Sequence, residues 1–452
     1  MIAIKKYLVA VTVIASLLMS ALVFADEYKG RVITLTDAQQ MALNNNYNIK
    51  NIRESVKKAR IQIWQAWAIL LPNLSADGSI VRNSNETSMD LPDFEYIART
   101  GDFQNAPTIS SNMTSLWVKQ FGFTANMTLL NARSFPLIKN AYDYRDNTEK
   151  TARHQKNDLL FAVTSAYYQI QFAKESIFVA EESMQNAEEF LKLSEAKKKV
   201  GQGTKIDLLR AESEVVNARK NLQNAEDSYK LAKTALSYLI GVDSEFDVVE
   251  PEDVVPVSGD LDLLSQKALS DRLDLDVAKQ NITMAKRDKL DTWMKWIPSF
   301  DITYKWDYTS SPMFGAEKDS WMLIFGAKWA ILDGGTKIAE LSQKAASKRM
   351  SENTYSQLKL DIKEDVEISL IEVKKRQRNI ELSKKQVEVA EEAHKLVSRQ
   401  YEMGMATSLD VSDAANQLSN VKYALVLEEL QYNLAVLTLN KVSGEYLPIA
   451  SR

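Results

Sequence analysis

The 452-residue sequence has no cysteine and only two histidines, His154 and His394. Without cysteine it can form no disulfide, thiolate metal site or lipid-modified N-terminal cysteine. With only two histidines, the sequence does not favour a zinc site, an iron site or a histidine-based catalytic triad. We therefore expect both histidines to be ordinary helix residues. We find no nucleophile–base pair, phosphate-binding loop or metal-ligand spacing. The sequence therefore predicts neither an enzyme nor a bound cofactor.

Long apolar runs are lacking after residue 25. A membrane-spanning helix needs about 20 apolar residues, so any membrane-embedded part is expected to be β-strand. Before that point, Lys5 and Lys6 precede an apolar run from Tyr7 to Phe24, and Ala25 closes it. This pattern predicts a secretory signal peptide, residues 1–25, cleaved after Ala25, with a single membrane anchor as the alternative.

The sequence also has no excess of basic over acidic residues. The signal segment carries two lysines and no acidic residue, which leaves 54 basic and 60 acidic residues and a formal charge of −6. A chain of this charge is not expected to bind nucleic acid.

The sequence is duplicated in tandem. Residues 35–74 align without gaps on 261–300 at an offset of 226, and residues 201–241 align on 404–444 at an offset of 203. The second alignment has eleven identities in 41 positions, with glycine at both ends in each copy. We therefore divide the chain into a first repeat (26–241), a linker (242–260) and a second repeat (261–452).

Each repeat predicts the same order of elements. A short and a medium helix end at Pro72 or Pro298, and alternating strands follow. Next comes a helix of about 67 residues, roughly 100 Å long, over about 132–199 and 336–402. After a glycine turn, a helix of about 37 residues ends at Gly241 or Gly444. Apolar residues at 3-4 spacing along these last helices predict coiled-coil packing.

The strands alternate between apolar and polar residues. From Phe300 to Tyr308, aromatic and aliphatic residues share one face and Asp, Thr and Lys the other, and residues 321–331 and 121–129 show similar patterns. A membrane β-barrel has this alternation, although a soluble sheet packed on a core shows it too. Aromatic residues at the strand ends favour lipid. Two strands per repeat give four per chain, too few to close a membrane barrel, so copies must assemble. The loops at one end are about Asn83 to Ser115, which is long and polar, and Thr309 to Asp319.

The glycine turns are the most specific motifs. They read Gly201-Gln-Gly-Thr204-Lys-Ile-Asp207 and Gly404-Met-Ala-Thr407-Ser-Leu-Asp410. With both repeats and their element order, they make the sequence resemble the TolC-type outer-membrane efflux channel family. The resemblance implies a homotrimer, with an α-helical barrel in the periplasm continuous with a 12-stranded β-barrel in the outer membrane. It also implies a periplasmic adaptor and an inner-membrane pump or ABC transporter as partners, in tripartite efflux or type I secretion.

The resemblance places the periplasmic entrance at these turns. Asp410 and Asp413 match an acidic pair that rings the entrance, where three copies would attract cations, and clustered like charge would raise some pKa values. The T-x-x-D spacing also predicts helix capping, so capping and pore lining are both open for Asp410. Asp413 is the better selectivity candidate, because its counterpart in the first repeat is Arg210.

The family's closed entrance is held by contacts between the two turns. Tyr401 and Asp207 match one such link, whereas Ala406 stands where a second link has a basic residue. The alternative function is a periplasmic coiled-coil adaptor or scaffold, although an adaptor would have one helical hairpin and this chain has two. The sequence does not specify the substrate.

Overall fold

The computed structural model describes residues 31–243, 246–251, 255–256, 258–312 and 317–445. The predicted signal peptide and its cleavage point after Ala25 lie outside the described residues. The chain divides into two compact units. The first is Met1–Val56, Glu149–Ala278 and Thr354–Arg452, and the second is Lys57–Thr148 and Lys279–Asn353. Each unit takes segments from both repeats, so the compact units cut across the duplication.

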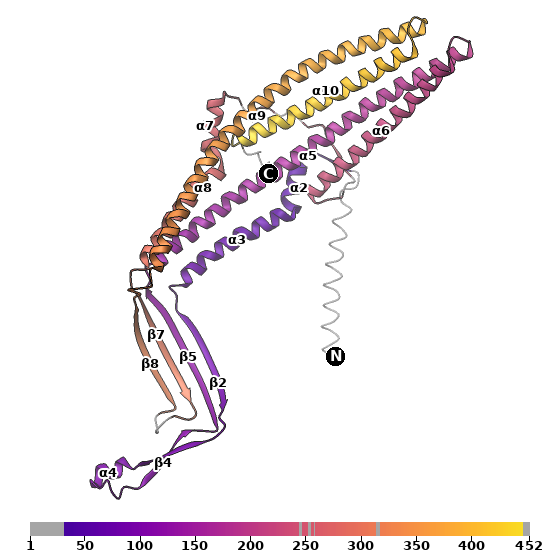
Figure 1. Cartoon of the computed structure of the whole chain (residues 1–452). Helices are drawn as coiled ribbons and strands as arrows, with labels where there is room; N and C mark the ends of the chain where they lie inside the picture. Colours follow the sequence, from indigo (N-terminus) through magenta and orange to yellow (C-terminus); the bar gives the residue numbers. More distant parts are fainter. Residues whose placement is uncertain (1–30, 244–245, 252–254, 257, 313–316, 446–452) are drawn as a thin grey trace, which may run out of the picture. The chain divides into compact units, whose positions relative to one another are not determined.

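The second unit contains a four-stranded antiparallel sheet in the order β2-β5-β7-β8 (Figure 1). Its strands are β2 (Asn73–Arg82), β5 (Trp117–Leu130), β7 (Ser299–Thr309) and β8 (Asp319–Lys328). The two strands predicted for each repeat are confirmed. Within the sheet the two repeats meet at the β5–β7 ladder, where β5 of the first repeat pairs with β7 of the second.

The two faces of this sheet differ as the alternation predicts. On one face, Phe123 lies opposite Trp306, which lies opposite Trp321. Phe325 and Trp321 on this face are 71% and 68% exposed, so nothing in the described chain covers it. On the other face, Asp77 and Asp307 flank Gly122, and their carboxylates occupy the space that a side chain there would need. The sheet therefore has an uncovered aromatic face and a polar face.

Helices account for most of the remaining described residues. They are α2 (Leu35–Asn45), α3 (Tyr47–Ala68), α5 (Ser134–Lys199), α6 (Lys205–Ile240), α7 (Leu261–Asp271), α8 (Leu273–Met294), α9 (Thr336–Glu402) and α10 (Ser408–Val442). The predicted long helices are confirmed to within two residues at each end. Among the described residues, no helix is both long enough and apolar enough to cross a membrane.

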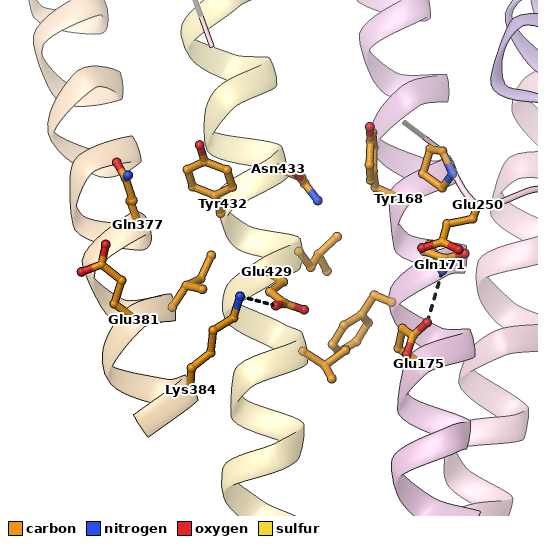
Figure 2. A pocket seen from close by; sticks show the side chains of 15 residues that line it. Tyr168, Gln171, Glu175, Glu250, Gln377, Glu381, Lys384, Glu429, Tyr432 and Asn433 are labelled. Carbon is orange, nitrogen blue, oxygen red and sulfur yellow. Dashed lines mark hydrogen bonds and ion pairs between the residues drawn. The ribbon is translucent and has the colours of Figure 1, made fainter. Parts of the chain in front are cut away.

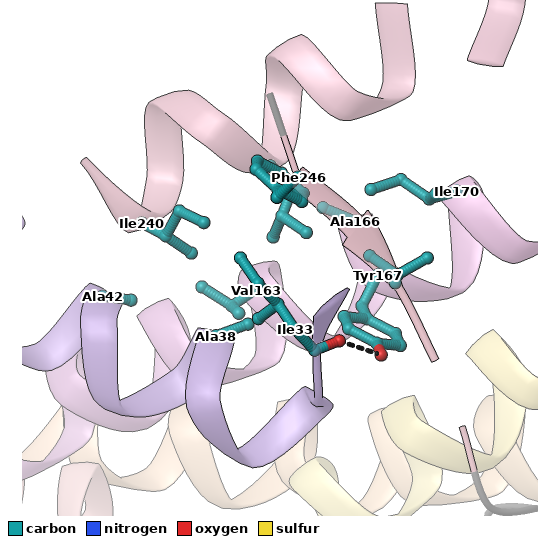
Figure 3. Close-up of a cluster of buried hydrophobic side chains, with 11 residues drawn as sticks. Ile33, Ala38, Ala42, Val163, Ala166, Tyr167, Ile170, Ile240 and Phe246 are labelled. Carbon is teal, nitrogen blue, oxygen red and sulfur yellow. Dashed lines mark hydrogen bonds between the residues drawn. The ribbon is translucent and has the colours of Figure 1, made fainter. Parts of the chain in front are cut away.

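The first unit contains two related hydrophobic clusters, one from each repeat. Figure 3 shows the cluster of the first repeat, built from α2, α5 and α6. The second repeat builds its own from α7, α8, α9 and α10. Equivalent positions are buried in both: Ala42 and Ala268, Val163 and Val366, Leu236 and Leu439. The duplication thus extends to side-chain packing.

The linker between repeats, expected from the sequence only to connect them, also contributes a strand. It contains β6 (Phe246–Val248), which pairs in parallel with β1 (Arg31–Ile33). The buried hydroxyl of Tyr167 lies 2.9 Å from the Ile33 carbonyl oxygen and 2.7 Å from that of Val249. Burial raises the pKa of Tyr167 to about 12, so this hydroxyl stays protonated as a donor. Three-residue strands give too little pattern to be recognised in a sequence.

Two further expectations need correction. The loop predicted over Asn83 to Ser115 contains β3 (Thr87–Pro92), α4 (Phe94–Thr100) and β4 (Thr108–Thr114). The strand predicted over 321–331 ends at Lys328. After it, the Trp329 indole donates to the Trp296 carbonyl (2.9 Å) and Lys337 donates to the Ala330 carbonyl, so these residues bind other partners than the ladder.

Candidate gating site at the hairpin turns

The two glycine turns have the same backbone geometry. Gly201 and Gly404 have φ of 80° and 81°, a left-handed conformation that favours glycine. After each glycine, the next amide donates to a carbonyl five residues earlier, from Gln202 at 2.9 Å and from Met405 at 2.8 Å. These bonds close the ends of α5 and α9 as Schellman motifs. The prediction of paired hairpin turns is confirmed.

Both following helices begin with a capping box. The Thr204 amide donates to the Asp207 carboxylate (2.9 Å), and the Asp207 amide donates back to the threonine hydroxyl (3.2 Å). Thr407 and Asp410 repeat the arrangement at 2.8 and 3.3 Å. The capping interpretation of T-x-x-D is therefore confirmed in both repeats.

Ser408 links the start of α10 to the start of α6. It is 1% exposed, and its hydroxyl donates to Asp207 Oδ1 at 2.5 Å. Arg210 donates to the same hydroxyl oxygen at 3.2 Å. The hydrogen bond from Ser408, followed by those from Thr204, lowers the pKa of Asp207 below its usual value, so the link is formed with Asp207 ionised. Sequence reasoning missed Ser408, which follows the conspicuous Thr407 and matches Lys205 in the first repeat.

A second polar link lies further along the same helices. Ser412 of α10 donates to Glu214 of α6, and the Asn416 side chain donates to the same carboxylate at 3.3 Å. Ser412, Asn416 and Ser408 share one face of α10, four residues apart. The hairpins are thus joined by a row of hydroxyl and amide donors bound to carboxylates.

Tyr401 makes different contacts from those predicted. It is 5% exposed and packs with Phe190, Ala211 and Val411 in a hydrophobic cluster. Its hydroxyl shares a hydrogen bond with Ser194 at 3.3 Å, and its ring lies 5.5 Å from that of Phe190.

The predicted Tyr401–Asp207 link is wrong within this chain. In the described structure, both carboxylate oxygens of Asp207 bind hydroxyl groups, of Thr204 and Ser408, and the Tyr401 hydroxyl binds Ser194 instead. Burying the tyrosine ring against α5 directs its hydroxyl to that helix.

A basic residue, Lys197, makes a further contact between α5 and α9 beside Ala406. Ala406 packs against the cluster around Tyr401. Lys197 of α5 lies over the Tyr401 ring, 4.2 Å from its centre, and donates to the Tyr401 carbonyl. Lys197 is one of three consecutive lysines at the end of a helix. Such a run is usually solvated, so nothing in the sequence singled out Lys197.

The two predicted entrance aspartates are both exposed. Hydrogen bonds from Thr407 lower the pKa of Asp410, which is opposite to the rise expected from clustered charge; within one chain the cap dominates. Asp413 makes no hydrogen bond or ion pair with any other described residue. Within the described residues, the structure thus gives the Asp413 carboxylate no structural partner.

A hollow of about 600 Å³ opens between α5, α9 and α10 further from the turns (Figure 2). Glu175, Glu250, Glu381 and Glu429 line it, with Lys384 3.8 Å from Glu429. Nearby, Lys422 of α10 bridges Glu182 of α5 (2.7 Å) and Glu391 of α9 (2.8 Å). The described residues contain no group of three or more metal-ligating side chains placed to hold an ion. The charged residues of the hollow and the Lys422 ion pairs therefore serve to join the three helices.

Two linked helical hairpins per chain, joined to strands with an uncovered aromatic face, define the class of outer-membrane helical channels. The family model "Outer membrane efflux protein" matches residues 38–242 and 264–445. The chain belongs to this family.

Several individual proteins are similar over nearly the whole chain. A probable efflux pump outer membrane protein, TtgC of Pseudomonas putida, is 22% identical over 415 residues, 90% of this chain and 81% of its own. Nodulation protein T of Rhizobium leguminosarum is 20% identical over 432 residues, 92% of this chain and 86% of its own.

Solved structures share the fold. A crystal structure of CusC has a TM-score of 0.76 at 19% identity, covering 91% of this chain and 92% of the other. The Campylobacter jejuni CmeC outer membrane channel has a TM-score of 0.74 at 14% identity, covering 92% of this chain and 87% of the other. At these identities the likeness establishes the fold.

Proposed function

We propose that this protein is the outer-membrane exit channel of a tripartite efflux or type I secretion system. It passes substrates from the periplasm, or directly from a pump, to the outside. The observation that supports this best is a sheet with one uncovered aromatic face, in a chain whose other elements are paired hairpins. An aromatic face uncovered by protein suits lipid, and the polar face suits a water-filled interior.

Three copies complete the channel in this proposal. In the described structure β2 pairs only with β5, and β8 only with β7, so the sheet has two open edges. Open edges expose unpaired backbone groups, which membrane barrels eliminate by closure. Joining β8 of one copy to β2 of the next closes a 12-stranded barrel when three copies take part.

The partners follow from the family. A periplasmic adaptor and an inner-membrane pump or ABC transporter would supply substrate and energy. Related proteins are named for toluene efflux, antibiotic efflux and nodulation, so the family fold accommodates different substrates. We therefore place substrate choice with the inner-membrane partner.

The hairpin turns form the periplasmic entrance in this proposal. Asp413, with Asp410 beside it, contributes to an acidic ring that favours cations. The entrance is kept closed by Lys197 on Tyr401, and by Asp207 and Arg210 on Ser408. Opening separates α10 from α6 and α9 from α5 at the turns, as a two-state change.

Fractionation tests the location and excludes the alternative. The full-length protein should sediment with the outer membrane in a density gradient and remain there after a urea wash, because lipid-facing strands need detergent for release. A periplasmic adaptor or scaffold would be released by urea. Release into the wash would therefore contradict the proposal.

A further inference from the structure

Positive charge is distributed unevenly over the four-stranded sheet. The basic residues of its strands are Arg82, Lys119, Lys305 and Lys328. Lys305 lies on the polar face and pairs with Asp307 at 3.0 Å. Arg82 ends β2 and Lys119 is near the start of β5, so both lie at the end of the sheet that continues into the loop between these strands. We call this end the loop end. The other end continues into α3 and α5.

Arg82 and Lys119 are diagonal neighbours on the aromatic face. Trp117 of β5 lies directly opposite Arg82, and the Arg82 guanidinium is 5.6 Å from the centre of its ring. Lys119 is two residues further along β5 and lies opposite Ile80. Because side chains alternate along a strand, Trp117 and Lys119 share the face of Phe121. Diagonal neighbours are about 7–8 Å apart, so two long side chains there can reach one anionic group. We call Arg82, Trp117 and Lys119 the basic corner.

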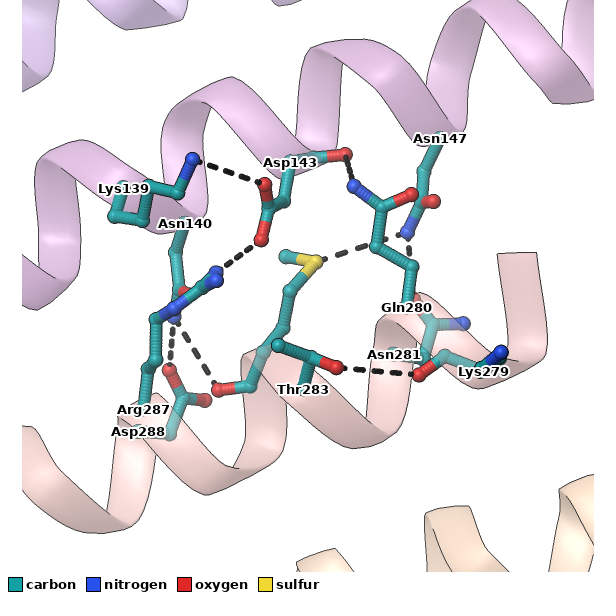
Figure 4. A network of polar contacts seen from close by, with 11 residues as sticks. Lys139, Asn140, Asp143, Asn147, Lys279, Gln280, Asn281, Thr283, Arg287 and Asp288 are labelled. Carbon is teal, nitrogen blue, oxygen red and sulfur yellow. Dashed lines mark hydrogen bonds and ion pairs between the residues drawn. The ribbon is translucent and has the colours of Figure 1, made fainter. Parts of the chain in front are cut away.

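The two cations of the basic corner have no acidic partner within the described chain. Both side chains are exposed, and neither forms an ion pair with a described residue. Arginines beyond the other end of the sheet are paired instead. Arg133 of the turn before α5 holds Asp291 of α8 through two bonds of 3.0 Å, and Figure 4 shows Arg287 of α8 donating to Asp143 of α5. The basic corner therefore has positive charge available for a ligand.

The height of the basic corner along β5 matches the boundary of a lipid layer. Between Lys119 and the helix end of the strand, the aromatic face runs from Phe121 to Leu130. Nine steps of about 3.4 Å, tilted by about 40°, rise roughly 24 Å, close to the apolar band of about 25 Å in membrane barrels. A basic residue facing lipid is costly at the membrane midplane and nearly neutral close to the surface. The basic corner therefore lies at the level where lipid headgroups begin.

We propose that the basic corner binds a phosphate group of a lipid in the outer leaflet of the outer membrane, where lipid A carries phosphates on its sugar headgroup. This inference rests on the proposed function, which places the loop end of the sheet outside. The planar Arg82 guanidinium donates two hydrogen bonds to the phosphate oxygens, and Lys119 adds a second positive charge. The Trp117 ring lies at the boundary between headgroups and acyl chains, as aromatic residues do at membrane surfaces.

A second copy of the chain offers a competing partner for Arg82. β2 is an edge strand, and in the proposed trimer it pairs with β8 of the next copy. The loop end of β8 carries Asp319, which lies opposite Tyr308 on the aromatic face. Lys119 is one strand further in, and its amide is bound by the Ser310 hydroxyl at 2.9 Å. An ion pair between copies would engage Arg82 and leave Lys119 free, so variants of the two residues distinguish the lipid from the second copy.

Binding of lipid A to the full-length, detergent-extracted protein tests the inference, with a chelator present so that no divalent cation forms a bridge. Lipid A with two phosphates should bind, and dephosphorylated lipid A with the same acyl chains should bind much more weakly. Each basic residue near an anionic membrane surface contributes about a factor of five. Arg82→Gln and Lys119→Gln should therefore each weaken binding about fivefold, and the double variant roughly 25-fold. Lys328→Gln, at the helix end of the sheet, is the matched control and should bind like the unmodified protein.

Several outcomes would overturn the inference. Equal binding of dephosphorylated lipid A, or undiminished binding in the double variant, would show that the basic corner does not hold a lipid phosphate. Displacement of lipid A by an equal concentration of inorganic phosphate would show a simple anion site. Trimers that dissociate in Arg82→Gln and in Asp319→Asn alike, with normal binding in Lys119→Gln, would assign Arg82 to an ion pair between copies. Conductance separates this inference from the proposed function, because channels that conduct normally without preferring the phosphorylated lipid would refute only the lipid site.

Discussion

At the scale of single residues, the two aspartates proposed to line the entrance, Asp410 and Asp413, have different surroundings although they lie three residues apart on one helix. Asp410 completes the capping box of α10, and its pKa is lowered by the Thr407 hydrogen bonds. Asp413 is exposed and binds no other described residue. A carboxylate without a structural partner costs little to replace, so Asp413 is the position where charge can be changed without disturbing the fold.

We therefore expect Asp413→Asn to reduce cation preference. In a trimer it removes three of six entrance carboxylates, which weakens the attraction for cations at the narrowest point. The reversal potential across a salt gradient in planar bilayers should move toward zero. Asp227→Asn on the exposed surface of α6 is the control and should leave it unchanged. An unaltered reversal potential in Asp413→Asn would remove this residue from the selectivity role.

At the scale of elements, the hairpins are held together by contacts from helix ends that the sequence pattern did not single out. Lys197 at the end of α5 combines a cation–π contact with a hydrogen bond to the Tyr401 carbonyl. The Tyr401 hydroxyl contributes only a neutral bond of 3.3 Å to Ser194. The two side chains therefore stabilise the contact between α5 and α9 unequally.

We expect Lys197→Met to raise basal conductance more than Tyr401→Phe does. The lysine contacts stabilise by about 2 kcal/mol and the neutral hydroxyl bond by about 0.5 kcal/mol. The open probability should then rise more than tenfold in Lys197→Met and about twofold in Tyr401→Phe, where 1.4 kcal/mol corresponds to a factor of ten. Lys198→Met is the matched control for charge. An equal or smaller rise in Lys197→Met, compared with Tyr401→Phe, would show that Lys197 does not hold the entrance.

The limits of sequence reasoning also follow element by element. Helices α5 and α9 were predictable because 66 and 67 residues contain no interior glycine and proline only at Pro136, in the first turn of α5. The turns were predictable because a residue with a left-handed backbone conformation at the end of a helix is usually glycine. The Ser408 and Lys197 contacts were not, because they join residues about 200 positions apart whose types are common on helices. The β1–β6 pair was missed for a similar reason, since three-residue strands form only by meeting each other.

At the scale of the whole molecule, the central feature is a duplication that builds one chain from two similar but unequal repeats. Corresponding residues form two hydrophobic clusters and two capped hairpins, while the sheet keeps two open edges. In the proposed channel three copies complete the ring, so conduction should require assembly.

Conductance of the purified, detergent-extracted protein in planar lipid bilayers tests this central claim most directly. The account predicts an oligomer of three chains that inserts and gives discrete, reproducible conductance steps, because the assembled polar faces enclose water. A monomer that stays in solution without detergent and gives no conductance would contradict it.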